Sequence, residues 1–577
     1  MRIKFEVRKF KDRIDNSISK TKKINLPELI NDKNPSAWKT DIKYYDKIKN
    51  RLGWLDLPVL FKENCSEIDS FVSDIRNEGF ESAVVLGMGG SSMCPEVFKE
   101  TFGSKKNYLK LFVLDSTDPE TVLSIEKSIK LEKTLFIVSS KSGGTIEVDS
   151  FFRYFFEKIK EVKGEEAGNH FIAITDPSTV LEDRARENKF RKIFINPPDI
   201  GGRYSALSYF GLVPAALTGI DIQRLLADAE KMMNICKIKS ARKNYGLKLG
   251  ITAGELAKKG IDKITFILSE DISSFGYWVE QLIAESTGKE GKGILPVEGE
   301  STKSLSRYGT DRLFVNIYTQ KNSKKAQRLY SSLSNKKFPV IDICIKNIYS
   351  IGGLFYLWEY ATSIMGYSLK INPFDEPNVS ESKENTGKVL KYFETENKLP
   401  LQKNSAEWKK LKIDTSIKLS SKNIKKKNKT GKKSFEEYLK TFFRQKKKND
   451  YISLMAYLHN SRKTNKLLNE IREILKEKLC IATTSGYGPR FLHSTGQLHK
   501  GGKNNGMFIQ FVCDDKKDIA TPGKMYSFGI LKQSQAIGDF ESLEKHGRRA
   551  IRIYLGKNYL KGLKNFKDMT EEVLKKN

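Results

Sequence analysis

Short apolar runs alternate with helical stretches from Ser82 onward, and this alternation sets the first expectation about the fold. Each run ends in glycine, serine or aspartate before a stretch with helical spacing begins. The runs are Ala83–Leu86, Leu111–Leu114, Leu135–Val138 and Phe171–Ile174. Strands that alternate with helices predict a parallel sheet covered on both faces, here in a first domain spanning 80–221. Ligands of such sheets bind at the carboxyl ends of the strands.

The alternation returns after a helical span near Ile222–Lys258. Strands are expected at Lys263–Leu268, Leu313–Tyr318 and Val340–Ile345, with helices near Ser274–Ser286 and Gly353–Met365. This pattern predicts a second domain of the same type over 222–393. The expected fold class is therefore α/β, with two doubly wound parallel-sheet domains, each a three-layer α/β/α arrangement.

The two ends of the chain have different patterns. Residues 1–79 are predicted to form a helical N-terminal cap, in which Trp38 and Trp54 are among the apolar anchors. Residues 394–448 are rich in lysine and poor in large aliphatic clusters, which is typical of a linker. Residues 449–577 are predicted to form an α+β domain. Its expected elements are helices at Tyr451–Leu458 and Lys463–Lys478 and strands at Phe508–Cys513 and Ile551–Tyr554.

The formal net charge of +32 raises the question of nucleic acid, because lysine-rich faces attract phosphate polymers through counterion release. Residues 401–450 alone contribute +12 of that charge, around the polar stretch Lys418–Lys433. The other lysines are dispersed and lack the aromatic interleaving of a base-stacking surface. We therefore expect no nucleic-acid partner. A nucleic-acid-associated protein remains a rival interpretation that a salt-dependent gel shift would expose.

Hydropathy and cysteine usage indicate in which cellular compartment the protein is expected. No stretch approaches the roughly 20 uninterrupted apolar residues that cross a bilayer, so no membrane association is expected. Met1–Lys23 is full of lysines and lacks an apolar signal segment. The six cysteines form no CxxC pair, which fits a reducing compartment and offers no zinc or redox motif. We expect a cytoplasmic protein without a metal or another cofactor.

The first glycine-rich motif, Gly87–Ser92, follows the first predicted strand, and Pro95 suits the first turn of the helix that comes next. Glycines let a backbone approach a ligand closely, and a helix N-terminus favours an anion. Ser92 stands where the dinucleotide fingerprint has its third glycine, and the chain contains no Walker-type loop. A turn needed only for tight packing is the alternative interpretation.

The second motif, Ser139–Thr145, follows the strand Leu135–Val138 and leads into a helix from Ile146. Several hydroxyls, two glycines and unpaired backbone N–H groups at a helix start form a cradle for an oxygen dianion. A monophosphate is the natural guest. A capped helix is the alternative, but a cap needs only one of the hydroxyls.

These motifs and three later ones together resemble the sugar isomerase (SIS) domain family, and within it the glucose-6-phosphate isomerases. The resemblance spans roughly Arg51–Lys383. It is carried by Gly89–Ser91, Ser140–Thr145, Gly201–Ser205, Gln281–Lys289 and Asn372–Lys383. The segment Ala482–Gly502 is similar to the C-terminal part of bifunctional transaldolase/glucose-6-phosphate isomerase proteins. A transaldolase barrel of about 250 residues has no room ahead of Arg51, so we expect that activity to be absent.

The resemblance implies roles for three catalytic residues. Glu285 occupies the position of the family's base, which moves a proton between C2 and C1 of the sugar through an ene-diolate. Arg203 matches the arginine that faces the developing oxyanion, although a structural salt bridge is an alternative role. Lys383 matches the lysine near the ring oxygen and the C1 hydroxyl during ring opening. Substrate contacts are expected from Gly90, Ser91, Ser140, Lys141, Ser142, Thr145, Gly202 and Gln281.

Two departures from the family pattern concern ring opening and one polar contact. The stretch 299–309 contains no histidine, although family members carry their ring-opening histidine shortly after the glutamate motif. Glu376 stands where the family usually has glutamine. We hypothesise that His493 or His499 from the C-terminal domain supplies the missing acid–base group, because imidazole titrates in the useful range. A domain contact, or an anion site with Arg490 and Lys500, is an equal alternative, and a zinc site lacks nearby ligands.

Together these expectations describe an intramolecular oxidoreductase, an aldose–ketose isomerase of glycolysis and gluconeogenesis that converts D-glucose 6-phosphate to D-fructose 6-phosphate. Mannose 6-phosphate is a further possible substrate. A non-catalytic regulator that senses sugar phosphates is the alternative function, and such a protein would not need Glu285, Arg203 and Lys383 in register. The family resemblance also suggests a homodimer.

Overall fold

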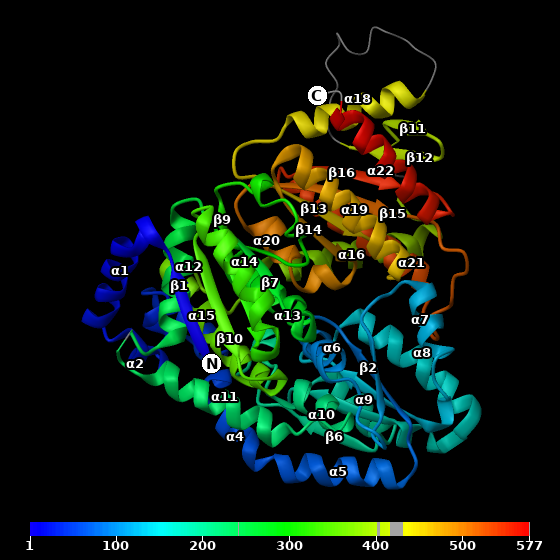
Figure 1. The fold of residues 1–577 in the computed structure, drawn as a ribbon. Coiled ribbons are helices and arrows are strands. Elements are labelled where there is room, and N and C mark those ends of the chain that lie inside the picture. The colour runs from blue at the N-terminus through cyan, green and yellow to red at the C-terminus, as the bar shows by residue number, and fades with distance from the viewer. Residues whose placement is uncertain (241, 401–403, 416–430, 576–577) are drawn as a thin grey trace. The chain divides into compact units, whose positions relative to one another are not determined.

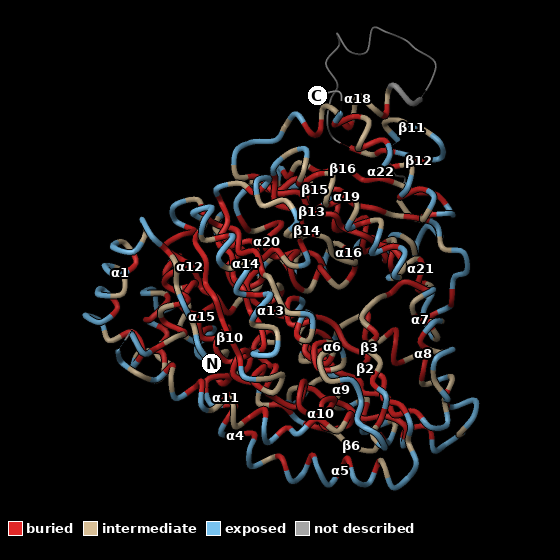
Figure 2. The backbone as a smooth tube through the Cα atoms, viewed as in Figure 1, coloured by how far each residue is buried: buried red, intermediate tan, exposed pale blue. Residues whose placement is uncertain are grey.

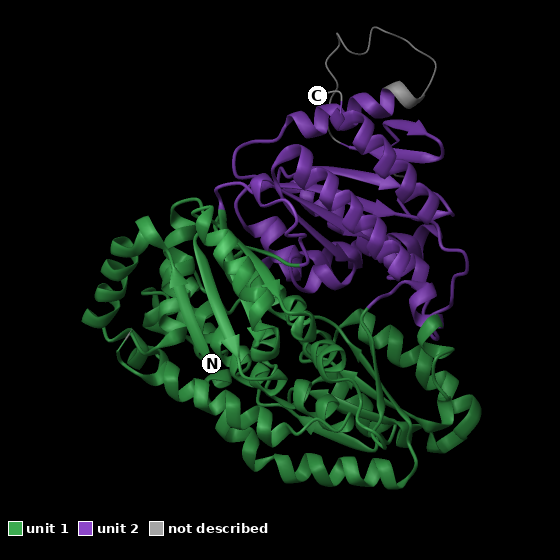
Figure 3. Ribbon diagram, in the orientation of Figure 1, with its two compact units in different colours: residues 1–115, 124–298, 312–376 green, residues 116–123, 299–311, 377–577 purple. Residues whose placement is uncertain are grey.

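The computed structural model describes residues 1–240, 242–400, 404–415 and 431–575. It divides into two compact units (Figure 3). Unit 1 contains residues 1–115, 124–298 and 312–376, and unit 2 contains residues 116–123, 299–311 and 377–577. Both sheets of the predicted sugar isomerase part lie in unit 1.

The first sheet of unit 1 has five parallel strands in the order β3-β2-β4-β5-β6 (Figure 1). The strands are β2 (Ser82–Gly87), β3 (Lys110–Leu114), β4 (Thr134–Ser139), β5 (Phe171–Thr175) and β6 (Lys192–Ile195). The helices are α6 (Gly90–Phe102), α8 (Ile146–Lys163), α9 (Val180–Glu187) and α10 (Tyr209–Leu217). The helix α7 (Pro119–Glu126) follows β3 along the chain, but most of it belongs to unit 2. The four predicted strands are confirmed. β6 was not predicted, because this short edge strand is only partly buried and leaves a weak apolar run.

The second sheet of unit 1 has the order β1-β10-β9-β7-β8, and its last four strands run parallel. The strands are β1 (Arg2–Glu6), β7 (Lys263–Leu268), β8 (Leu295–Val297), β9 (Arg312–Thr319) and β10 (Val340–Ile345). The helices are α11 (Ile222–Lys237), α12 (Tyr245–Lys258), α13 (Phe275–Thr287), α14 (Ser323–Asn335) and α15 (Ile351–Leu369). The expected α/β class, with two parallel sheets covered by helices, is confirmed.

The N-terminal segment is only partly the helical cap that was predicted. Its helices are α1 (Lys11–Lys23), α2 (Leu26–Asn31), α3 (Tyr45–Lys49), α4 (Leu57–Glu63) and α5 (Cys65–Asn77). The first residues instead form β1, which pairs antiparallel with β10. Ile3 and Phe5 alternate there with charged residues, and this period of two suits an edge strand. Figure 2 shows inner strands such as β2 and β10 buried, while α1 and α5 keep an exposed face.

Unit 2 is built on one six-stranded sheet of order β11-β12-β16-β15-β13-β14. Its strands are β11 (Ala406–Trp408), β12 (Leu411–Asp414), β13 (Tyr451–Ala456), β14 (Ala482–Tyr487), β15 (Gly506–Val512) and β16 (Arg549–Tyr554). Its helices are α16 (Pro377–Glu396), α18 (Gly431–Arg444), α19 (Arg462–Leu479), α20 (Gly496–Gly501), α21 (Phe528–Lys545) and α22 (Tyr559–Lys575). Four strands pair parallel and two pair antiparallel, so the predicted α+β arrangement is corrected to a mainly parallel α/β one.

The prediction of a helix over Tyr451–Leu458 was wrong, because β13 occupies this run. All six residues of β13 are buried, since the strand lies inside the sheet with parallel neighbours on both sides. Such an apolar run, buried on both faces, cannot be told from a buried helix by its periodicity. Length was the better guide, because the run ends after six residues.

The predicted linker 394–448 is only partly a linker. The Lys418–Lys433 stretch falls largely outside the described residues. On either side of it, β11, β12 and α18 belong to unit 2. Phe435, Leu439, Phe442 and Phe443 follow helical spacing on α18 and are buried in the core of the unit. The apolar face of α18 is thus mainly aromatic, and this is why the scarcity of aliphatic residues led to the prediction of a linker.

A buried ion pair attaches the segment 116–123 to the rest of unit 2. Lys532 Nζ on α21 lies 2.8 Å from Asp118 Oδ2 and also contacts Asp515. Nearby, Thr117 Oγ1 donates to Gln535 Oε1 at 2.8 Å. The side chains of Lys532 and Asp118 are 1% and 3% exposed, so the Asp118 carboxylate depends on Lys532 for most of its compensation, with His459 Nδ1 at 3.5 Å as a second neighbour.

Replacing Lys532 by methionine should lower the free energy of unfolding of unit 2 by about 3–5 kcal/mol, because Asp118 would stay buried without its partner. Native-state hydrogen exchange of the β13 and β15 amides measures this change. Lys545→Met on the same helix is the matched control, since that side chain is 74% exposed and pairs weakly with Glu381. Equal protection in the two variants would contradict the assigned role.

Candidate active site

The two glycine-rich motifs lie at one edge of the first sheet. β2 and β4 are parallel neighbours, and Gly87 pairs in register with Ser139. The turn after Gly87 and the loop after Ser139 therefore leave the sheet side by side at the carboxyl ends of their strands. This is the edge at which ligands of parallel α/β sheets bind.

Gly90 has a structural reason to be glycine. A Cβ atom there would lie 2.0 Å from the carbonyl oxygen of Gly202. The preceding Gly89 has φ +57°, a conformation that side chains rarely adopt. The turn can thus touch the Gly201–Ser205 segment only because both residues lack side chains. Ser91 follows within the first turn of α6 and is buried.

The loop Ser140–Thr145 has the form of an anion cradle. Ser140 Oγ lies 3.0 Å from Thr145 Oγ1, and Gly143 turns the backbone with φ +68°. Thr145 stands directly before α8, yet its side chain makes no capping hydrogen bond. The hydroxyls therefore gather at a helix start without being used as a cap, which favours ligand binding over the capped-helix alternative.

The Lys141 ammonium does not point freely from this loop. Lys141 Nζ contacts the carboxylate of Asp176 and donates to the carbonyl oxygen of Pro198 at 3.0 Å. A phosphate would thus meet this residue through its backbone N–H rather than through its side chain, unless that ion pair opens. Ser142 at the tip of the loop is exposed.

Arg203 lies in a short 3-10 helix, Gly202–Tyr204, and its guanidinium connects several chain segments. Nη1 donates to Glu285 Oε1 at 2.9 Å and to Glu376 Oε2 at 3.0 Å. Nε donates to Ser286 Oγ at 2.8 Å. Nη2 donates to the carbonyl oxygens of Pro373 and Asp375 at 2.9 and 3.0 Å. With its side chain only 1% exposed, Arg203 is a fixed buried cation.

Glu285 lies on α13 with its side chain 9% exposed. One oxygen accepts from Arg203, and the other accepts from Gln281 Nε2 at 3.1 Å, one helical turn earlier. Burial raises the pKa of Glu285 above its ordinary value, the Arg203 charge opposes that shift, and repulsion from Glu376 adds to it. The arrangement is a desolvated carboxylate with two fixed hydrogen-bond donors, and it can accept and return a proton.

Lys289 is a neighbouring residue whose place the sequence did not indicate, although it lies inside the Gln281–Lys289 motif. Lys289 Nζ lies 2.7 Å from Asp375 Oδ1 and also contacts the carbonyl oxygen of Asp375. Burial, together with the charge of Arg203, lowers the pKa of Lys289 to about 8. Lys289 and Arg203 thus hold the segment that carries Glu376.

Three of the predicted functional residues, Lys383, His493 and His499, belong to unit 2. His499 is buried between the rings of Tyr451 and Phe508. Burial and the charges of Lys500 and Arg548 lower its pKa to about 3, so it stays neutral near pH 7. His493 is half-buried in a short 3-10 helix. Of the two histidines, His493 is therefore the more accessible to solvent or a ligand.

Among the described residues, no group of three or more histidine, cysteine, aspartate and glutamate side chains could share a metal ion. Within the same ranges, no helix is both long enough and apolar enough to cross a membrane. All six cysteines are free thiols.

Comparison with known proteins matches the chain to sugar-phosphate isomerases. A family model described as "Phosphoglucose isomerase" matches residues 63–297. A "Glucose-6-phosphate isomerase" of Carboxydothermus hydrogenoformans is 30% identical over 409 residues, covering 60% of this chain and 86% of that protein. The "Glucose-6-phosphate isomerase" of Mycoplasmopsis pulmonis is 27% identical, covering 64% of this chain and 98% of that protein.

Solved structures agree on the fold. A hypothetical protein from Thermus thermophilus matches with a TM-score of 0.58 and 23% identity, covering 67% of this chain and 99% of that one. A glucose-6-phosphate isomerase from Chlamydia trachomatis matches with a TM-score of 0.50 and 21% identity, covering 58% of this chain and 74% of that one. At these identities the structures support the shared architecture and nothing finer.

Proposed function

This chain belongs to the glucose-6-phosphate isomerase family, and from that premise we propose that it interconverts D-glucose 6-phosphate and D-fructose 6-phosphate. The observation that carries the proposal is the buried Glu285 carboxylate, held by Arg203 and Gln281. An aldose–ketose isomerisation needs one base that removes a proton from one carbon and returns it to the next. A regulator that only senses sugar phosphates has no use for such a group.

The phosphate of the substrate would bind in the Ser140–Thr145 loop. Ser140 and Thr145 would donate from their hydroxyls, and the start of α8 would supply backbone N–H groups. Ser91 and Gly202 would flank the sugar, since Gly90 brings their two turns together. Binding energy from the phosphate, which does not react, would orient the carbons that do.

The proton transfers would centre on Glu285. In the open-chain aldose, its carboxylate takes the C2 proton while the C1 carbonyl becomes an ene-diolate oxygen. The O2 proton then passes to O1, Glu285 delivers its proton to C1, and the C2 carbonyl forms. Arg203 lies 2.9 Å from Glu285, so its guanidinium is close enough to stabilise the oxyanion during both transfers. Water is largely excluded from this pair, which strengthens the interaction.

Ring opening requires a second proton carrier, and we assign it to Lys383 with His493. His493 remains half-buried, whereas the neutral, buried state of His499 fits a packing role. We further propose a cytoplasmic enzyme, in keeping with its free thiols, and a homodimer on the strength of the family resemblance.

Glu285→Gln should lower kcat by about 10²–10⁴-fold, because the amide keeps the shape of the side chain but cannot accept the proton. A coupled assay that follows fructose 6-phosphate formation measures the loss. Glu270→Gln, on an exposed residue ahead of α13, should leave kcat unchanged. Wild-type turnover in Glu285→Gln would remove Glu285 from its role as base.

Glu376→Gln should move the acidic limb of the pH–kcat profile to lower pH. Glu376 shares Arg203 Nη1 with Glu285, and its negative charge helps to raise the pKa of Glu285. Removing that charge lowers the pKa, so the base remains ionised at lower pH. Kinetic profiles from pH 4 upward for both proteins test this; an acidic limb that stays in place, or moves to higher pH, contradicts it.

His493→Asn should slow turnover of the cyclic sugar phosphate more than turnover of an open-chain analogue, by about 10²-fold or more. His499→Asn should instead reduce stability, because an amide replaces a packed ring, and should leave the ratio of the two rates unchanged. Parallel assays of both substrates with each variant provide the measurement. If His493→Asn leaves both rates unaltered, ring opening does not use this residue.

A further inference from the structure

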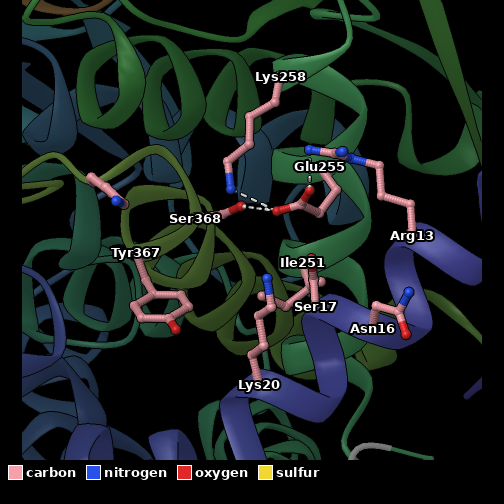
Figure 4. Close-up of a pocket in the computed structure, with 10 residues that line it drawn as sticks. Arg13, Asn16, Ser17, Lys20, Ile251, Glu255, Lys258, Tyr367 and Ser368 are labelled. Atoms are coloured by element: carbon pink, nitrogen blue, oxygen red, sulfur yellow. Dashed lines mark hydrogen bonds and ion pairs between the residues drawn. The ribbon is translucent and has the colours of Figure 1, made fainter.

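A charged cavity of about 700 Å³ lies in unit 1 between α1, α12 and the end of α15 (Figure 4). Its residues are distinct from those of the candidate active site. The volume is within the range of small-molecule sites, roughly 300–1,000 Å³. None of the motifs that resemble the isomerase family includes a residue of its lining.

A buried carboxylate fixes two cations in the cavity wall. Glu255 is 5% exposed, and its oxygens lie 2.9 Å from Arg13 Nη2 and 2.6 Å from Lys258 Nζ. Ser368 Oγ donates to the same carboxylate at 3.3 Å. Figure 4 shows Arg13 reaching from α1 and Lys258 from α12 toward Glu255. The two cations are thus held in place before any ligand arrives.

Two further cations border the cavity without a compensating charge. Lys20 on α1 and Lys370 after α15 are exposed, and neither has an ion pair with any residue in the described ranges. The lining therefore carries four cations and one carboxylate. Convergence of such charges in a concave space concentrates anions in a way that scattered surface lysines do not.

The geometry points to a second ligand site here, for a small molecule that carries two or more phosphate groups. Its phosphates would contact Lys20 and Lys370 and the outer N–H groups of Arg13 and Lys258. Tyr367 provides an aromatic wall for the organic part of the ligand. A single carboxylate ligand would leave most of the positive charge uncompensated, so the charge count favours a polyphosphate.

Calorimetric titration with pyrophosphate and with ATP, at about physiological salt, tests the site on the full chain. The background variant is Ser140→Ala/Thr145→Val, which weakens phosphate binding at the active-site loop. We expect one site that binds both probes in competition. Lys20→Gln/Lys370→Gln should weaken both probes at least tenfold, with the thermal unfolding midpoint unchanged.

The matched control is Lys127→Gln/Lys324→Gln, which removes the same charge from exposed positions elsewhere in unit 1 and should leave the affinities as they were. Equal weakening by the two double variants would assign the binding to overall charge and overturn the proposal. Absence of binding in the background variant, or two probes that do not compete, would also overturn it. Isomerase activity is not the readout, so this outcome is independent of the function proposed above.

Discussion

The candidate site depends on the hydrogen bonds and ion pairs that the guanidinium of Arg203 makes. Arg203 follows the first sheet along the chain, and it binds α13 through Glu285 and Ser286. It also binds the backbone of the segment before α16 through two carbonyl oxygens. A single planar cation with five donors can do this, whereas a lysine could not satisfy the same set. The position of the base is therefore set by the same group that would stabilise the charge it creates.

Burial of Glu285 and Lys289 shifts the pKa values of both side chains. In water, Glu285 would be an ordinary weak base, but desolvation raises its pKa while Arg203 keeps it from rising without limit. Lys289 experiences the opposite effect, since burial lowers the pKa of an amine. The two residues lie four positions apart near the end of one helix, and their pKa values move toward each other. Groups tuned in this way are typical of sites that exchange protons.

The sequence allowed the strands of unit 1 to be predicted because each is an apolar run closed by a turn. Fully buried β4 is an example, and so is the loop that follows it. The same signal failed at β13, where burial on both faces removes the period that separates strand from helix. It also failed at α18, because its apolar face is aromatic and lies beside a lysine-rich stretch. The sequence assigned single residues to motifs, but it did not predict which side chains they contact in the folded protein.

In the candidate site, too, some features could be predicted from the sequence and others could not. Arg203 lies about 80 residues before Gln281 and Glu285, which are one helical turn apart on α13. The motifs that contain these three residues were sufficient to assign them to one site. The pairing of Lys141 with Asp176 could not be predicted, since it depends on how β4 and β5 pack. Nor could the burial of His499 on α20, because its ring packs against two aromatic rings from the strands β13 and β15. Contacts across a fold decide which polar residues are available for chemistry.

Unit 2 is assembled from three separate stretches of chain, and this has a consequence for biosynthesis. Asp118 leaves the ribosome 414 residues before Lys532, the cation that compensates it. During that interval the growing polypeptide carries the Asp118 carboxylate without the cation of Lys532. Residues 116–123 can therefore complete their contacts with unit 2 only after Lys532, in the last tenth of the chain, has been made. Translation order alone would thus delay completion of the fold, whatever the intrinsic folding speed of either sheet.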